Sequence, residues 1–157
     1  ARFDADAAYL GKNSQTIDYN IVADHFGKKT ESLITVNGAL TDSAKKVFRG
    51  TIDFKKGSAD SVGSENETVL MLGDDVVNKT VPLILCAEEN VEGTHGATIG
   101  ELDADTMFYF ESRGIDRETA EKIMAYAAVE RLIHMAEDSE FAAVAEKAMG
   151  IKTDTEE

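Results

Sequence analysis

A histidine set among small residues is the part of this sequence best suited to chemistry. His95 lies in the tract Gly93-Thr94-His95-Gly96-Ala97-Thr98, where small neighbours leave its imidazole uncrowded and let a ligand or another backbone approach closely. In a loop at the end of a strand, a neutral imidazole nitrogen can ligate a metal ion or cluster. One histidine cannot hold a metal alone, so this hypothesis requires co-ligands from elsewhere in the fold or from another subunit. A structural or surface histidine is the alternative.

The other two histidines and the lone cysteine are predicted to have no part in chemistry. Cys86 lies inside the apolar run 81–87, where a cysteine packs as a small hydrophobe, and we expect it in the core. His25 and His134 have no second histidine at a metal-binding spacing, so we expect each to be structural or exposed. A single cysteine also excludes an internal disulfide and favours a reducing, cytoplasmic compartment.

Two further motifs give little support for catalysis. The run Gly11-Lys12-Asn13-Ser14 resembles the end of a phosphate-binding loop, but Asp6 stands where that loop requires its first glycine. The paired acids at 74–75 and 88–89 could bind cations or transfer protons. Adjacent residues of a strand face opposite ways, however, so we expect both pairs to lie in solvated turns.

The charge balance restricts the partners of this protein. The 157 residues include 30 acidic and 16 basic side chains, for a net charge of −14, which repels nucleic acid and anionic membrane surfaces. No apolar run approaches the roughly 20 residues of a membrane helix, so we expect soluble protein partners. Because the chain begins at Ala1 and not at a methionine, we expect it to be part of a longer protein.

Short apolar segments separated by turn residues predict a β-rich first part. The predicted strands lie near residues 17–21, 33–36, 48–54, 69–72 and 81–86. Their centres are roughly 12 to 18 residues apart, which suits the rungs of a stacked β-solenoid. A sandwich remains open, since Asn37-Gly38 at the end of one segment favours an antiparallel hairpin. Periodicity alone does not decide between the two architectures.

The sequence after Gly100 predicts helices. A run without turn residues begins near 107 and stops at Gly114, which is typical of a short helix with a glycine end. Asp116 can cap a longer helix that extends to about 136. Asp138 or Ser139 can start a last helix, closed by Gly150. We therefore expect a β part over 1–101, a helical domain over 102–152 and a frayed tail over 153–157, an order that excludes a Rossmann-type alternation.

The order of several short motifs resembles one known family. These motifs are Phe48-Arg49-Gly50, Leu70-Met71-Leu72, Pro82, Val91, the tract 95–98, Asp103, Phe108-Tyr109 and Ser112-Arg113-Gly114-Ile115. Together they resemble the C-terminal region of the SufB/SufD family, subunits of an iron-sulfur cluster assembly scaffold. The resemblance implies a mainly β fold, a right-handed parallel β-helix (solenoid) without its N-terminal rungs, followed by a C-terminal α-helical domain.

The same resemblance implies a function and partners. It implies a scaffold subunit and not an enzyme, paired through its β-helix with a SufB-like subunit or with a second copy. The helical domain would dock a SufC-like ABC-type ATPase, which supplies the ATPase activity. A transient iron-sulfur cluster, or iron, would be shared with the partner subunit and would not be held by this chain alone. His95 matches the histidine that SufD-like members offer to that subunit interface.

Departures from the SufB pattern place the chain on the SufD-like side of the family. A SufB-like subunit carries a cysteine six residues before the proline and a glutamate directly after the histidine, where this chain has Val76 and Gly96. The resemblance therefore implies that a thiolate ligand comes from the partner. Many SufD-like tracts also have a cysteine two residues before the histidine, and here that residue is Gly93.

Two alternatives to a cluster scaffold stay open at this point. A carbohydrate-active β-helix enzyme would need clustered carboxylates beside an aromatic or basic platform, whereas this chain has no tryptophan and its acids are scattered among turns. A structural paralogue would bind partners without contacting a cluster.

Overall fold

The computed structural model describes residues 1–149, which form seven strands and then three helices. The strands are β1 (Arg2–Gly11), β2 (Thr16–His25), β3 (Glu31–Thr41), β4 (Lys45–Phe54), β5 (Ser61–Leu72), β6 (Val77–Cys86) and β7 (Val91–Glu101). The helices are α1 (Ala104–Glu111), α2 (Arg117–Met135) and α3 (Ser139–Met149). The predicted tail at 153–157 and the predicted helix stop at Gly150 lie outside the described residues.

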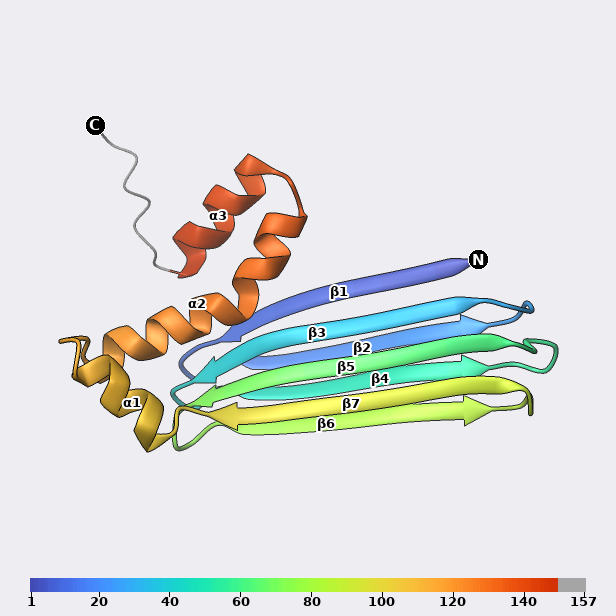
Figure 1. Cartoon of the computed structure of the whole chain (residues 1–157), viewed down its shortest axis with the longest axis horizontal. Helices are drawn as coiled ribbons and strands as arrows, with labels where there is room; N and C mark the ends of the chain where they lie inside the picture. The colour runs from blue at the N-terminus through green and yellow to red at the C-terminus, as the bar shows by residue number, and fades with distance from the viewer. Residues whose placement is uncertain (150–157) are drawn as a thin grey trace.

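The strands form a parallel β-solenoid, as the resemblance predicted. One sheet has the order β1-β3-β5-β7 and the other β2-β4-β6, and every pair is parallel. Figure 1 shows the two sheets as two layers, in which the strands of one layer point in the opposite direction to the strands of the other. Register pairs Arg2 with Glu31, Glu31 with Val62 and Val62 with Glu92, so one turn takes about 30 residues. The sandwich alternative is therefore wrong.

The interior is built from alternate residues of each strand, because successive side chains of a strand point to opposite faces. Inward side chains stack on the residue in register one turn away and form continuous columns. The enclosed apolar residues include Ile34, Val36, Leu40, Phe48, Ile52, Phe54 and Val69. Burial of these side chains stabilises the solenoid by roughly 1.5–3 kcal/mol per residue relative to exposure.

Gly38 has a different role from the one its sequence context predicted. The pair Asn37-Gly38 lies in the middle of β3 and makes no hairpin turn. Gly38 is in register with Tyr9 of β1, and a Cβ atom at residue 38 would come within 2.5 Å of the Tyr9 ring. The glycine is required because the aromatic ring lies directly on its backbone.

Capping residues mark the starts of α1 and α2, and the predicted cap at Asp116 and glycine stop at Gly114 are confirmed. Asp103 accepts a hydrogen bond from the Thr106 amide at 2.7 Å, and Asp116 accepts one from the Thr119 amide at 2.8 Å. Gly114 has φ of +79°, the left-handed conformation of a helix stop. None of the three helices in the described residues is long and apolar enough to cross a lipid bilayer.

Helix α2 packs against the solenoid instead of extending away from it. It contacts β1, β3 and β5, and a small apolar cluster joins Ala125 of the helix to Ala39 and Leu72 of the strands. An ion pair of 2.6 Å between Arg131 and Asp6 links the same two parts. Figure 1 shows α2 lying across the C-terminal ends of β1 and β3, with α1 and α3 on either side.

His25 is a buried structural residue, which agrees with one of its two predicted roles. Its Nδ1 lies 2.6 Å from the Thr30 hydroxyl and its Nε2 lies 2.8 Å from the Ser32 hydroxyl. The ring also packs on Phe54, with the two ring centroids 4.7 Å apart. Burial lowers the pKa of His25, against a smaller opposing effect of the charge on Asp24.

This environment predicts a loss of stability at acid pH. The folded pKa of His25 lies below its ordinary value of 6.5, so its stabilising contribution is complete above pH 6.5 and is lost as the pH falls below that value. We expect the free energy of unfolding, measured with urea, to fall more steeply between pH 7.5 and 5.5 in the wild type than in His25→Gln. The difference cannot exceed about 1.4 kcal/mol per pH unit, the limit for one proton. Parallel curves would contradict the prediction.

Candidate functional site at the open end of the solenoid

His95 lies in the middle of strand β7, which corrects the prediction of a loop at a strand end. It is in register with Glu65 of β5, and in-register residues of a parallel sheet share one face. Gly93, two residues earlier, marks that face as the inward one, since its Cβ would lie 2.9 Å from Ile84 Cγ2. His95 is nevertheless exposed, because within residues 1–149 no strand stacks on β7. It is therefore an inward-facing residue of the last turn, formed by β6 and β7, which no further strand covers within residues 1–149. We call this uncovered side of the last turn the open end of the solenoid.

A buried ion pair lies one turn below this open end. Lys46 of β4 reaches across the interior to the Glu67 carboxylate, which also accepts a hydrogen bond from Thr80 of β6. The Lys46 ammonium is 3.3 Å from the Thr80 hydroxyl and 5.6 Å from the centroid of the Tyr9 ring. Burial lowers the pKa of Lys46, while the hydrogen bond and charge of Glu67 oppose that shift.

Glu65 is a second buried carboxyl group and lies directly behind His95. Its side chain is 2% exposed, and its Oε2 atom has no hydrogen-bond partner among the described residues. The carboxyl group lies over Gly50 of β4, where any Cβ atom would overlap it. Burial raises the pKa of Glu65 and the charge of Glu67 adds to that effect, whereas His95 acts in the opposite direction. The sequence offered no sign of this residue, because Glu65 and Glu67 lie in a stretch that looks like a polar turn.

Cys86 is exposed, so its predicted place in the core is wrong. It ends strand β6 in register with the buried Phe54, but β6 belongs to the last turn, and no further turn covers it in the described part of the chain. Residues 1–149 contain no cluster of three or more His, Cys, Asp or Glu side chains that could hold a metal ion. His134 is exposed on α2, with Nε2 3.4 Å from Glu130.

The paired acids lie in turns, as predicted. Asp74 and Asp75 form the turn between β5 and β6, and Glu88 and Glu89 lie in the bend after β6. The backbone N–H of Gly57 donates a hydrogen bond to the Glu88 carboxylate, which lowers the pKa of that group. This contact joins two successive loops and gives Glu88 a structural role.

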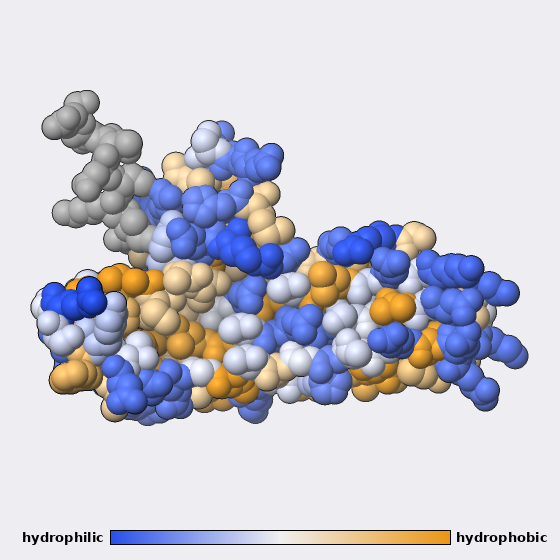
Figure 2. All heavy atoms as spheres, viewed as in Figure 1, coloured by the Kyte–Doolittle hydropathy of each residue, from blue (hydrophilic) through white to orange (hydrophobic). Residues whose placement is uncertain are grey.

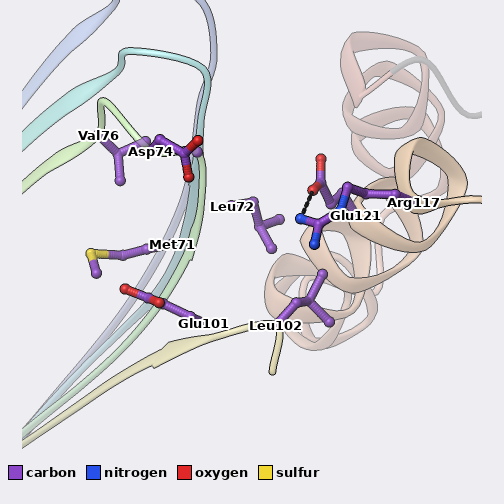
Figure 3. Close-up of a pocket in the computed structure, with 9 residues that line it drawn as sticks. Met71, Leu72, Asp74, Val76, Glu101, Leu102, Arg117 and Glu121 are labelled. Carbon is purple, nitrogen blue, oxygen red and sulfur yellow. Dashed lines mark hydrogen bonds and ion pairs between the residues drawn. The ribbon is translucent and has the colours of Figure 1, made fainter. Parts of the chain in front are cut away.

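A groove of about 590 Å³ separates the strand ends from helix α2. Figure 3 shows the ion pair of Arg117 with Glu121 on one wall and strand residues on the other. Its remaining lining includes Met71, Leu72, Gly73, Asp74, Val76, Glu101 and Leu102. The groove is lined by both acidic and apolar side chains, and Arg117, the cation among the described residues of this lining, is paired with Glu121.

The outer face of the last turn is more apolar than the same face of the turn before it. On β4 the outward residues include Arg49, Thr51 and Asp53. The residues in register with these on β6 are Val81, Leu83 and Leu85, which are 51%, 46% and 40% exposed. Figure 2 shows hydrophobic patches along the lower edge of the solenoid, where Figure 1 places β6 and β7.

The fold and this site define a parallel β-solenoid protein whose last turn presents a histidine, an unpaired strand edge and an apolar outer face. The sequence matches, over residues 1–128, the family described as "SUF system FeS cluster assembly, SufBD core domain". The chain belongs to the SufB/SufD family, and within it the chain is SufD-like.

Individual relatives match different lengths of the chain. It is 31% identical over 123 residues to the iron-sulfur cluster assembly protein SufD of Bacillus subtilis, which covers 78% of this chain and 28% of that protein. It is 30% identical over 88 residues to SufD of Escherichia coli, which covers 56% of this chain and 21% of that protein. A chloroplastic SufBD family protein of Arabidopsis thaliana is 27% identical over 143 residues, 91% of this chain and 26% of the relative. The chain thus spans less than a third of the length of each of these relatives.

Proposed function

We propose that this protein is a SufD-like scaffold subunit of an iron-sulfur cluster assembly complex. In this proposal it pairs with a SufB-like subunit through the open end of the solenoid and docks a SufC-like ATPase through its helices. The ATPase activity belongs to that partner. The observation that carries the proposal is the combination of His95 and an apolar edge on the same terminal turn.

The unpaired edges of the last turn favour pairing with another subunit. Within residues 1–149, β6 bonds only to β4, and β7 bonds only to β5. An exposed strand edge can accept a further strand, and proteins usually protect such edges with charges. The outer face of β6 instead carries Val77, Val81, Leu83 and Leu85, with Lys79 as its one charged residue. A partner strand would complete the backbone hydrogen bonds, and the side chains on the same face of that strand would pack beside these apolar residues.

Pairing at this edge places His95 at the interface between the subunits. Its imidazole then supplies one nitrogen ligand to iron or to a nascent cluster, which is the cargo of the complex. The remaining ligands, including a thiolate, come from the SufB-like partner, because Val76 and Gly96 replace the residues that characterise that side of the family. Imidazole and thiolate together suit iron-sulfur chemistry.

Helix α1 is the part of the helical domain best suited to contact the ATPase. Phe108 and Tyr109 are 72% and 54% exposed on consecutive positions, and Arg113 lies over the Tyr109 ring at 4.5 Å. Aromatic residues and arginine are enriched at the centres of protein interfaces. Because the neighbouring helix α2 packs on the solenoid, movement of a docked ATPase would be transmitted to the strands, and hence to the cluster interface.

The same valine-to-lysine substitution, made at two sites on the outer face of the β2-β4-β6 sheet, tests the pairing. Val81→Lys places a charge on the proposed interface, and we expect it to weaken binding to the SufB-like subunit by about 2 kcal/mol, roughly 30-fold in Kd. Val22→Lys on β2 is the control, since Val22 is 48% exposed and Val81 51% exposed. Isothermal titration calorimetry measures both constants. Equal effects of the two variants, or no effect of either, would contradict pairing through this edge.

A further inference from the structure

We propose that Glu65 is a positioning residue for His95: its buried carboxyl group accepts a hydrogen bond from the imidazole and turns the other ring nitrogen toward the open end. This inference rests on the proposed role of His95 and adds a second residue of this chain to the site. It assigns a purpose to a buried carboxyl group that no other contact explains.

The column of side chains that contains His95 gives the first reason. The residues in register along this column are Ala5, Ile34, Glu65 and His95, one from each turn. Adjacent strands lie about 4.8 Å apart, so the side chains above and below Glu65 are its nearest neighbours along the axis. Ile34 on one side is apolar and fully buried. His95 on the other side is therefore the polar neighbour of Glu65 in this column.

The opposite wall of the solenoid gives the second reason. The Glu65 carboxyl group lies over Gly50, and the residue in register with Gly50 on the last turn is Pro82. Neither residue has a side-chain donor, and proline has no backbone N–H either. The enclosed Oε2 atom has no partner among the described residues. A buried acceptor without a donor costs about 1–3 kcal/mol, which a bond from His95 would offset.

The neighbouring Glu67 shows that this shortage of donors is specific to Glu65. Glu67 faces the same interior from two residues further along β5, and both Lys46 and Thr80 donate to it. These two donors lie on β4 and β6, the strands that carry Gly50 and Pro82 opposite Glu65. The donor group that remains for Glu65 is the imidazole of His95, whose charge already acts on the pKa of Glu65.

The arrangement has a direct consequence for ligand chemistry. His95 has one neighbour toward the interior and an open side toward a partner, so its two ring nitrogens have different surroundings. Histidines that ligate metals commonly donate their second N–H to a carboxylate, which fixes the tautomer and the ring orientation. Because His95 is exposed, its ring is not held in another orientation by a further turn of the described solenoid.

Nitrogen-15 NMR of the imidazole rings in this protein tests the inference without any cluster. The three histidines can be assigned by single His→Gln substitutions. In the wild type above pH 8 we expect His95 to adopt one fixed tautomer. Glu65→Met removes the acceptor and should give the mixture of tautomers found in a solvent-exposed histidine, whereas Glu65→Gln keeps an acceptor oxygen and should preserve the fixed form. Glu92→Met, on the outward face of β7, is the matched control and should change nothing.

Two outcomes would overturn the inference. The first is a tautomer mixture at His95 in the wild type, which requires no variant to fold. The second is a single tautomer that survives Glu65→Met in a folded protein. Neither outcome would affect the proposed function, which depends on His95 itself.

A metal titration separates the inference from the proposed function. In the complex with the SufB-like subunit, we expect Glu65→Met to lower the affinity for Zn²⁺, used as a probe, by 10- to 100-fold, with no change in Glu92→Met. Equal affinities in wild type and Glu65→Met would contradict the positioning role. If the wild-type complex binds no Zn²⁺ while the tautomer responds to Glu65→Met, the ligand role of His95 fails and the contact between the two residues stands.

Discussion

His95→Ala is expected to reduce cluster formation by the assembled complex roughly tenfold or more, because loss of a ligand costs at least as much as loss of its supporting contacts. The substitution should leave the fold unchanged, since His95 is exposed and packs against no further turn of the described solenoid. Reconstitution with Fe²⁺ and sulfide, followed by visible absorption, measures the amount of cluster formed per complex.

A second exposed histidine provides the control for this experiment. His134 lies on α2, away from the open end, and is also exposed, so His134→Ala should form as much cluster as the wild type. Full cluster formation by His95→Ala in an intact complex would show that the histidine is not a ligand. That result would favour a structural subunit that binds partners without contacting the cluster.

Lys46→Ala is expected to lower the free energy of unfolding by about 3–5 kcal/mol, the cost of leaving a buried charge without its partner. Lys46 is fully buried and Glu67 is 2% exposed, so solvent cannot compensate the carboxylate. Urea denaturation monitored by circular dichroism measures the change.

A double substitution distinguishes the loss of a charge partner from a simple loss of volume. Lys46→Met with Glu67→Met removes both charges and keeps much of the packing, and such replacements of buried pairs are often neutral or stabilising. We therefore expect the double variant to be more stable than Lys46→Ala by several kcal/mol, of the order given above. A cost below about 1 kcal/mol for Lys46→Ala would show that the pair contributes little to the folded state.

The sequence predicted the helical part well because its signals are local. Capping by Asp116, the glycine stop at Gly114 and the start of α3 at Asp138 each depend on residues within one turn of helix. The structure shows these contacts, including the Asp138 carboxylate that accepts a hydrogen bond from the Phe141 amide at 3.0 Å. Such interactions can be recognised without knowledge of the rest of the fold.

The strands were only partly predictable because their stability comes from residues about 30 positions away. Strand β1 and strand β7 were not expected from their own composition, since β1 contains several small or acidic residues and β7 is rich in glycine and threonine. Both are strands because a neighbouring strand pairs with them. The same cause explains Gly38, which is required by the Tyr9 ring one turn away.

The sequence allowed His95 to be proposed as the site residue, but it did not allow the surroundings of that residue to be predicted. His95 could be selected from its small neighbours and from the family resemblance, whereas its place on the inward face depends on the register with Glu65. The exposure of Cys86 likewise depends on where the stack of turns ends, and its apolar neighbours gave the opposite impression. Lys46, Glu65 and Glu67 are polar residues that the topology buries, and no periodic pattern distinguished them from surface residues.

Native mass spectrometry of the co-expressed proteins tests the central claim most directly. The protein is produced together with the cognate SufB-like subunit and SufC-like ATPase, and the complex is isolated through a tag on this protein. We predict one assembly that contains all three proteins, as expected if the open solenoid end and the helices bind different partners. Recovery of this protein alone, or only as a pair of identical copies, would contradict the proposed scaffold function.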